Sequence, residues 1–314
     1  MRLAEVQGRS FEPVGFVLGD RLSVANYAKA LSIDEPLYRS ADEARVAGWP
    51  GRPVPPGMLA FFLAFPDPGV WDELGVTWGR TLAGTIEIEA ARLAGEEEFV
   101  EGRAHVEAVW ERPGRDGDAR QFLRLRSDFT DEKGEFVGRW RVTFVERAGG
   151  PPSGSVPQED PGGGGEELPL ERLAPRSAPP AGAQAGTDLP AHRTAPLDRL
   201  AFARMSVALD DPNLVHLDEA VAAAAGFPSV IGSGGFVVGA LAEVVRRWAG
   251  VDRVVRGTTR QLQPLWPGTA LTARGSVTAL ERRSDRPVAV CTTELVDQTG
   301  QRIAEGTFDA LLED

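Results

Sequence analysis

The sequence predicts an α+β fold made of two similar units, each an antiparallel sheet that wraps one apolar helix. The chain has 314 residues, of which 42% are hydrophobic. We therefore expect two cores, because a single core stops growing at about 250–300 residues. A segment rich in Gly and Pro divides the chain, and each side repeats one order of elements: short helices, an apolar helix, then alternating strands.

Three regions follow from this division. We expect the first unit at residues 1–148 and the second at residues 191–314. Residues 149–190 are crowded with Gly, Pro, Ser and Ala, which predicts an extended, mobile linker with an apolar island at residues 168–173 able to dock on a neighbour. The run Gly162 to Gly165 has no strand before it and no Gly-Lys-Ser/Thr after it, so it is not a phosphate-binding loop.

Helical patterns precede the strands in the first half. A helix is expected at residues 23–31 with Ser23 as its N-cap, and a short one at 40–47. Pro55-Pro56-Gly57 introduces a very apolar helix at 58–65. Alternating apolar residues predict four strands, at 81–92, 99–112, 121–130 and 136–147.

The second half follows the same order. Helices are expected at residues 196–206, from the N-cap Asp218 to before Gly226, and, as the apolar helix, at 236–249. The predicted strands are 253–263, 270–280, 288–297 and 301–311.

A constant spacing relates the two halves. Gly48-Trp49-Pro50 and Gly226-Phe227-Pro228 lie 178 positions apart, and so do Met58 and Phe236, which open the two apolar helices. A constant offset indicates an internal duplication.

The second half contains an acid and an imidazole five positions apart, Asp211 and His216, followed by a glycine-rich turn. Such a pair beside backbone donors is able to move a proton to or from water while charge develops on a carbonyl. The offset of 178 places Ile33 and Tyr38 at the matching positions of the first half. Isoleucine takes no proton, and a phenol with a pKa of about 10 is a poor base at neutral pH. We therefore expect chemistry in the second half only.

These residues carry a family resemblance. The second half resembles the hydratase motif of the MaoC-like, (R)-specific enoyl-CoA hydratases and 3-hydroxyacyl dehydratases, through Phe202-Ala203-Arg204-Met205-Ser206, Asp211-x-Asn213-x-x-His216, Ala225-Gly226-Phe227-Pro228, Ile231 and Gly234. The first half resembles the degenerate N-terminal domain of two-domain members, through Tyr27-Ala28, Pro36-Leu37-Tyr38, Gly48-Trp49-Pro50-Gly51 and Pro55-Pro56. That family has the hot-dog fold, so the resemblance implies a double hot-dog.

The motif departs from the family pattern at three places. Asp210 stands where the family usually has Gly, Leu214 stands where it usually has Pro, and Gly232-Ser233-Gly234 stands where it usually has Ala-His-Gly. We take Asp211 as the acid because only Asp211 has the family spacing to both Asn213 and His216.

The resemblance implies reversible hydration of a trans-2-enoyl thioester to an (R)-3-hydroxyacyl thioester. Asp211 and His216 would hold the reacting water, and the backbone N–H near Gly234 would bind the thioester carbonyl. Ser233 would be a further substrate contact, and Asn213 would fix the loop. The expected partner is an acyl-CoA or acyl carrier protein thioester, with no metal and no redox cofactor.

Other interpretations stay open at this point. Asp211, Asn213 and the Gly-rich turn are also typical of capping and turn residues, and a lone histidine on such a loop is often structural. Among enzymes, a hot-dog thioesterase would release free thiol without a 3-hydroxy product. A non-catalytic acyl-binding subunit would bind acyl-CoA tightly without turnover.

Charge and composition argue against several classes of function and location. A net charge of −12 argues against nucleic-acid binding, which needs a basic face. Neither a secretory signal nor an apolar run of about 18 residues is present, so we expect a cytoplasmic protein that does not span a membrane. The lone Cys291 is expected to be a buried structural thiol. The oligomeric state stays open, a homodimer included, because the internal pair already supplies an interface.

Overall fold

The computed structural model of the chain describes residues 5–60, 81–113, 119–146, 170, 173–211 and 213–313. Its strands are β1 (Val14–Leu18), β2 (Thr81–Ala90), β3 (Glu98–Pro113), β4 (Ala119–Asp131), β5 (Phe136–Glu146), β6 (His192–Arg193), β7 (Val254–Gln261), β8 (Thr272–Arg283), β9 (Arg286–Val296) and β10 (Arg302–Leu311). Its helices are α1 (Arg21–Ala30), α2 (Pro36–Arg39), α3 (Ala41–Val46), α5 (Arg199–Leu209), α6 (Glu219–Ala224) and α7 (Gly234–Ala249), with 3-10 helices η2 (Pro56–Leu59) and η5 (Leu214–His216).

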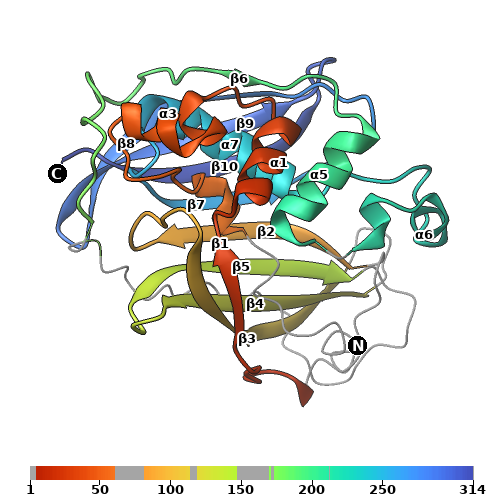
Figure 1. Cartoon of the computed structure of the whole chain (residues 1–314). Helices are drawn as coiled ribbons and strands as arrows, with labels where there is room; N and C mark the ends of the chain where they lie inside the picture. Colours follow the sequence, from red (N-terminus) through yellow and green to blue (C-terminus); the bar gives the residue numbers. More distant parts are fainter. Residues whose placement is uncertain are drawn as a thin grey trace.

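The strands of both halves form one continuous sheet. In the described part of the chain it has ten strands in the order β1-β3-β4-β5-β2-β7-β10-β9-β8-β6. The halves meet where β2 pairs antiparallel with β7, from Thr85 opposite Arg260 to Glu89 opposite Arg256. Figure 1 shows the helices of both halves gathered on one side of this sheet. The architecture is the α+β double hot-dog expected from the sequence.

The helices repeat with the offset seen in the sequence. Helix α5 begins 178 positions after α1, and α6 begins 178 positions after α3. Helix α7 likewise begins 178 positions after η2. The duplication inferred from short motifs therefore extends to the element boundaries.

Several elements differ from the sequence expectation. Helix α1 is capped by Asp20 and not by Ser23: Asp20 Oδ1 accepts hydrogen bonds from the N–H groups of Leu22 (2.9 Å) and Ser23 (3.1 Å). Where a helix was expected at residues 58–65, the described part is the short η2, and Phe61, Phe62 and Phe65 lie outside the described residues. The short strands β1 and β6 were not predicted, because neither is long enough to show a clear alternation.

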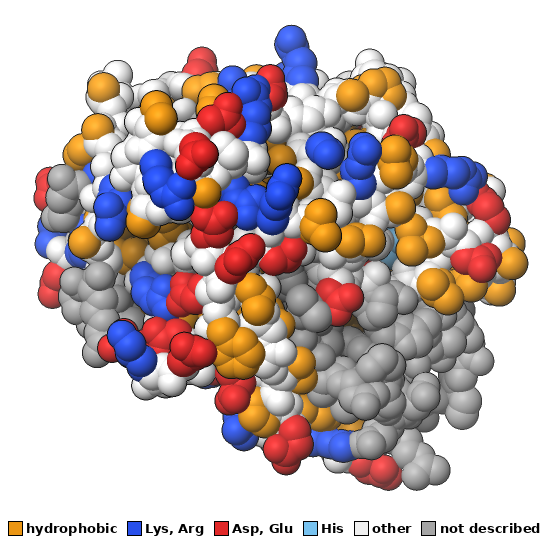
Figure 2. All heavy atoms as spheres, in the orientation of Figure 1, with side chains coloured by type: hydrophobic (Ala, Val, Ile, Leu, Met, Phe, Trp, Pro, Cys, Tyr) orange, Lys and Arg blue, Asp and Glu red, His pale blue; other side chains and the backbone are white. Residues whose placement is uncertain are grey.

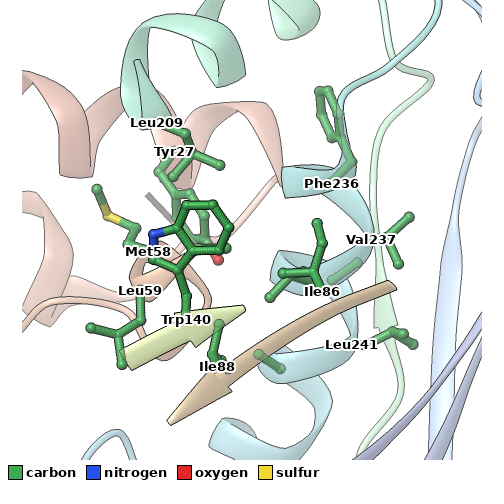
Figure 3. Close-up of a cluster of buried hydrophobic side chains, with 14 of the residues drawn as sticks. Tyr27, Met58, Leu59, Ile86, Ile88, Trp140, Leu209, Phe236, Val237 and Leu241 are labelled. Carbon is green, nitrogen blue, oxygen red and sulfur yellow. The ribbon is translucent and has the colours of Figure 1, made fainter. Parts of the chain in front are cut away.

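One hydrophobic core joins the two halves, where two cores were expected. Helix α7 is buried along nearly all its length, packing against β7 to β10 and against η2. Figure 3 shows Tyr27, Met58 and Leu59 of the first half in one cluster with Phe236 and Val237 of α7, with Ile86 of β2 drawn between the two groups. Because burying each such side chain contributes about 1.5–3 kcal/mol, this shared cluster strongly favours the joined arrangement.

The end of the expected linker is packed on the second half. The N–H of Gly186 bonds to the carbonyl of Val277 (2.8 Å), and the N–H of Leu189 bonds to that of Gly275 (2.9 Å). Residues 186–189 thus lie along β8, where a mobile linker was expected. The apolar island docks as expected at Leu170 and Leu173, which are buried in a small cluster with Val255, Val288 and Leu311.

Candidate active site

The segment that carries the predicted acid and base is shaped by local backbone contacts. Helix α5 ends at Asp210, which adopts a left-handed conformation (φ 46°, ψ 49°) and turns the chain. The N–H of Asp211 then bonds to the carbonyl of Ser206 (2.8 Å). Asn213 caps η5, its Oδ1 accepting from the N–H of Val215 (3.2 Å). His216 is the last residue of η5, so the Asn213 cap on this short helix helps to fix the position of the His216 backbone.

Asp211 and His216 lie against each other in the interior. His216 Nε2 is 3.2 Å from Asp211 Oδ2, and the two residues are 7% and 8% exposed. On the other side of the ring, His216 Nδ1 is 2.7 Å from the carbonyl oxygen of Ile231. A carbonyl oxygen only accepts, so Nδ1 carries a hydrogen and donates it. In the neutral ring, Nε2 is left with a lone pair that faces the carboxylate, and proton exchange is confined to Nε2 and Oδ2.

The surroundings of His216 favour its charged form. Burial alone lowers the pKa of the imidazole, but the charge of Asp211 and the hydrogen bonds to Asp211 and to the Ile231 carbonyl outweigh it, so the pKa is raised. The neighbouring carboxylate, Asp210, is exposed, and partial burial together with the charge of Asp211 raises the pKa of Asp210. The structure therefore places Asp211, and not Asp210, beside the imidazole.

The Gly-rich turn places the start of α7 beside this pair. Ser233 is the N-cap of α7: its Oγ accepts from the N–H of Gly235 (3.3 Å), and the residue is 1% exposed. The N–H of Gly234 has no hydrogen-bond partner among the residues that the structure describes. A Cβ at Gly234 would lie 2.7 Å from Ile86 Cδ1 of β2, so the end of the Ile86 side chain would have to move to accept one. The free N–H at the positive end of a helix is suited to bind a developing negative charge.

A cavity of about 220 Å³ connects these groups. Asp211, Asn213, His216 and Gly234 line one side of it, whereas Ser233, which was expected to contact substrate, is not in its lining and caps the helix. The first half supplies residues 81–84 of β2 together with Phe144 and Val145 of β5, and the chain after β7 supplies residues 261–264. The cavity thus lies at the junction of the two halves.

Comparisons with known proteins support the domain types and the fold. Residues 179–299 match the MaoC-like domain, and residues 5–139 match the FAS1-like dehydratase domain region. The chain therefore carries a MaoC-like domain in its second half and has the double hot-dog fold. A solved MaoC-like dehydratase superposes with a TM-score of 0.77 at 19% identity, with 98% of each chain covered. A Mycobacterium tuberculosis protein with a double hot-dog fold superposes with a TM-score of 0.64 at 16% identity, covering 97% of this chain and 96% of that one.

A curated relative matches part of the MaoC-like protein. It is a UPF0336 protein of Saccharopolyspora erythraea, 27% identical over 146 residues, which is 45% of this chain and 88% of the relative. The relative therefore corresponds to about one of the two units.

The first half of the MaoC-like protein has no comparable acid and base. Tyr38, the counterpart of His216, is 2% exposed, and its hydroxyl has no hydrogen-bond partner within the described ranges. The guanidinium of Arg246 lies over the Tyr38 ring and pairs with Glu243 (Nε to Oε2, 2.6 Å) and with Glu35 (Nη2 to Oε1, 2.8 Å). Burial, the largest influence, raises the pKa of Tyr38. The position that matches the imidazole thus holds a neutral phenol beside an ion cluster.

Other groups in the MaoC-like protein offer little competing chemistry. Burial, and then the charge of Asp309, raise the pKa of the Cys291 thiol to about 12, so a thiolate nucleophile is disfavoured. In the described residues, His, Cys, Asp and Glu side chains do not gather in threes that could hold a metal ion. None of the helices described is both long and apolar enough to cross a membrane.

Exposed apolar side chains lie next to the Asp211–His216 segment. Leu214 and Leu217, on either side of His216, are 54% and 44% exposed, and Val207 of α5 is 63% exposed. Figure 2 shows hydrophobic side chains on the side that carries α5 and α6, with acidic and basic side chains among them. Exposed aliphatic side chains thus flank the segment that carries the pair.

Proposed function

We propose that the protein catalyses reversible hydration of a trans-2-enoyl thioester to an (R)-3-hydroxyacyl thioester, carried by CoA or by acyl carrier protein. The observation that carries this proposal is the buried Asp211–His216 pair, which lines one cavity with the unpaired N–H of Gly234. The matches to the MaoC-like domain and to the FAS1-like dehydratase domain region support the reaction class.

The pair would move protons between water and the acyl chain. A water held at Asp211 Oδ2 and His216 Nε2 adds its oxygen to C3 of the enoyl chain and loses one proton to the pair. The pair returns one proton to C2, so it ends in its starting state, and dehydration runs these steps in reverse. Because Nδ1 is bonded to the Ile231 carbonyl, the ring keeps its orientation while Nε2 gains and loses the proton.

The start of α7 would stabilise the charge that forms on the thioester oxygen. Addition at C3 places negative charge on the carbonyl oxygen before C2 is protonated. The N–H of Gly234 donates to that oxygen, aided by the positive end of the helix. Ser233 acts indirectly, since its bond to the N–H of Gly235 holds the first turn in place.

The first half would shape the acyl site without taking part in the chemistry. Leu82 and Ala83 of β2 and Phe144 and Val145 of β5 give the cavity an apolar wall opposite the catalytic pair. An acyl chain fits such a wall, whereas a polar substrate would lose its hydration there without replacement. The exposed Leu214 and Leu217 extend the apolar surface outward from the site.

The test is turnover of a panel of enoyl and 3-hydroxyacyl thioesters of graded chain length, with chiral analysis of the product. We expect formation of the (R)-3-hydroxy product. Asp211→Asn and His216→Gln should each lower kcat/KM by roughly 10²-fold or more, because each removes a proton-transfer group.

Asp210→Asn is the matched control. It removes the adjacent carboxylate, and asparagine tolerates the left-handed backbone at this position, so activity should stay near that of the wild type. Full activity in both Asp211→Asn and His216→Gln would rule the mechanism out. Release of free thiol without a 3-hydroxy product would identify a thioesterase instead, and tight binding without turnover across the panel would identify a non-catalytic acyl-binding protein.

A further inference from the structure

The first half contains a counterpart of the catalytic cavity. A second, small cavity is lined by Val54 and Pro56, which lie 178 positions before Gly232 and Gly234 of the catalytic cavity. The end of β2 and the residues after it line this second cavity, as the end of β7 and the residues after it line the catalytic cavity. Likewise, the start of β7 lines the second cavity and the start of β2 lines the catalytic cavity. The two cavities are therefore related by the internal duplication, and they lie at opposite ends of the β2–β7 pair.

A leucine from the segment between the two halves occupies the second cavity. Leu173 is 7% exposed and contributes to the lining together with Leu59 and Val255. The free space that remains is about 20 Å³, against about 220 Å³ in the catalytic cavity. The difference is consistent with a side chain filling the space that an acyl chain would take in the other half.

Residues 173–177, which we call the strap, hold Leu173 in place. The N–H groups of Arg176 and Ser177 both donate to Asp252 Oδ2, the second over 3.3 Å. Arg253 Nε donates to the carbonyl of Ser177 (2.9 Å). Leu173 is also held by its own backbone: its N–H donates to the carbonyl of Leu170 (3.1 Å), and its carbonyl accepts from Arg286 Nη1. All these contacts involve backbone groups of the strap and none involves the Leu173 side chain, so the side chain is able to leave its cavity, and its departure removes the apolar part of what holds the strap.

The cavity adjoins a crevice of mixed charge. The crevice has a volume of about 290 Å³, and Arg52, Arg92 and Arg176 line it together with Glu96 and Asp252. Arg52 is paired with Glu96, and Arg92 with Glu98 and Asp131, but Arg176 is exposed and forms no ion pair with the described residues. An apolar cavity below a free guanidinium matches an apolar chain that ends in an anionic group.

We propose that the first half retains a second acyl-binding site, closed by Leu173, for a fatty acid or similar anionic amphiphile. The chain takes the place of the Leu173 side chain between Leu59 and Val255, and the anionic group lies at Arg176. A chain of about eight or more methylene groups buries more apolar surface than one leucine, so it is able to displace Leu173. This site is independent of hydration at Asp211 and His216, since neither Ile33 nor Tyr38 lines it.

Binding of dodecanoate to the full-length protein tests the proposal. In the wild type, saturating dodecanoate should speed amide hydrogen exchange in the strap, because displacement of Leu173 loosens it. Leu173→Ala should bind dodecanoate at least tenfold more tightly in calorimetry, with an unchanged exchange rate in residues 213–217 beside the catalytic cavity. Leu170→Ala is the matched control, because Leu170 lies in the same cluster but does not line the cavity. Its affinity for dodecanoate should equal that of the wild type.

The anionic group is tested separately. Arg176→Gln should weaken binding of dodecanoate to Leu173→Ala about tenfold and leave binding of uncharged dodecanol unchanged. Equal dodecanoate affinity in Leu173→Ala and Leu170→Ala would overturn the site, as would strap exchange that dodecanoate does not alter. Because every readout is binding or exchange, the hydration assay can fail or succeed without deciding this result.

Discussion

The guanidinium carbon of Arg246 lies 5.8 Å from the centre of the Tyr38 ring, and Tyr38 holds the position in the first half that corresponds to His216 in the second. Arg246 comes from α7, the helix whose first residue lines the same cavity as Asp211 and His216. One helix thus serves both halves: its start lies at the cavity that contains the Asp211–His216 pair, and its last turns contact Tyr38. A stacked cation of this kind is worth about 0.5–2 kcal/mol, so Tyr38 has a structural role even without a proton to transfer.

Tyr38→Phe should leave the free energy of unfolding unchanged or raise it by up to about 1 kcal/mol. The Tyr38 hydroxyl is buried without a hydrogen-bond partner among the described residues, which lowers the stability of the native state. Phenylalanine removes this hydroxyl and keeps the ring that packs against Arg246. Tyr38→Ala, in contrast, should lose about 3–5 kcal/mol because it also removes the ring. Urea unfolding of both variants gives the answer, and a loss of more than 1 kcal/mol in Tyr38→Phe would show that the hydroxyl makes a favourable contact.

Stability should fall as the pH rises through the folded-state pKa of His216. That pKa is raised above the value of about 6.5 in the unfolded chain, so the folded state binds the proton more tightly. The resulting stabilisation is complete below about pH 6.5 and is lost as the pH rises through the higher folded-state pKa. Denaturation at a series of pH values should show this loss in the wild type and not in His216→Gln. Parallel profiles for the two proteins would contradict the raised pKa.

The partner responsible for that pKa can be identified by NMR. Asp211→Asn removes the nearby negative charge but keeps a side chain of similar shape, so the His216 titration midpoint should move to lower pH. With three histidines in the chain, the His216 signal is assigned by its loss in His216→Gln. Asp210→Asn serves as the control and should shift the midpoint much less, since Asp210 is exposed.

Ser233→Ala should reduce both stability and activity. Loss of an N-cap costs about 1 kcal/mol, and here the cap also holds the turn that presents the N–H of Gly234. Ser40 caps α3 in the first half, its Oγ accepting from the N–H of Glu43 (3.1 Å), far from the catalytic segment in the chain. Ser40→Ala should therefore lose similar stability with kcat unchanged. A comparison of melting temperature and kcat separates the two effects, and unchanged kcat in Ser233→Ala would mean that the cap is only structural.

Gly57→Ala should destabilise the joint between the halves by about 1–3 kcal/mol. The added Cβ would meet the Tyr27 hydroxyl and lie 2.9 Å from the Cα of Gly239, and the backbone of α7 cannot move aside as a side chain would. Gly95→Ala is the control, since its nearest neighbour is a glutamate oxygen at 3.6 Å. Equal unfolding midpoints for the two variants would contradict the close packing of η2 against α7.

Local signals account for what the sequence could predict. Periodic apolar residues and Gly/Pro boundaries marked the strands of both halves, and the spacing from Asp211 to His216 marked the pair that the structure brings to 3.2 Å. The choice of Ser23 as a cap failed because Asp20, three residues earlier, competes for the same N–H groups.

Long-range contacts explain what the sequence could not predict. The β2–β7 pairing depends on which sheet edges meet, and no residue pattern encodes that choice. For the same reason, the sequence did not indicate that residues of the first half, such as Phe144 and Val145, would line the cavity of Asp211 and His216. The Ile231 carbonyl that orients His216 is a backbone group, so residue identity gives no sign of it.

The continuous sheet has a consequence for how such a molecule is able to change over generations. In an assembly of two identical subunits, every substitution appears twice, and a change from aspartate to isoleucine would remove both acids at once. Here Ile33 and Asp211 are separate codons of one chain, joined through β2 and β7. The fusion therefore lets the two halves differ at matching positions, so that one half places an acid and an imidazole at the cavity while the other supplies apolar residues to its wall. A pair of identical subunits cannot have this asymmetry.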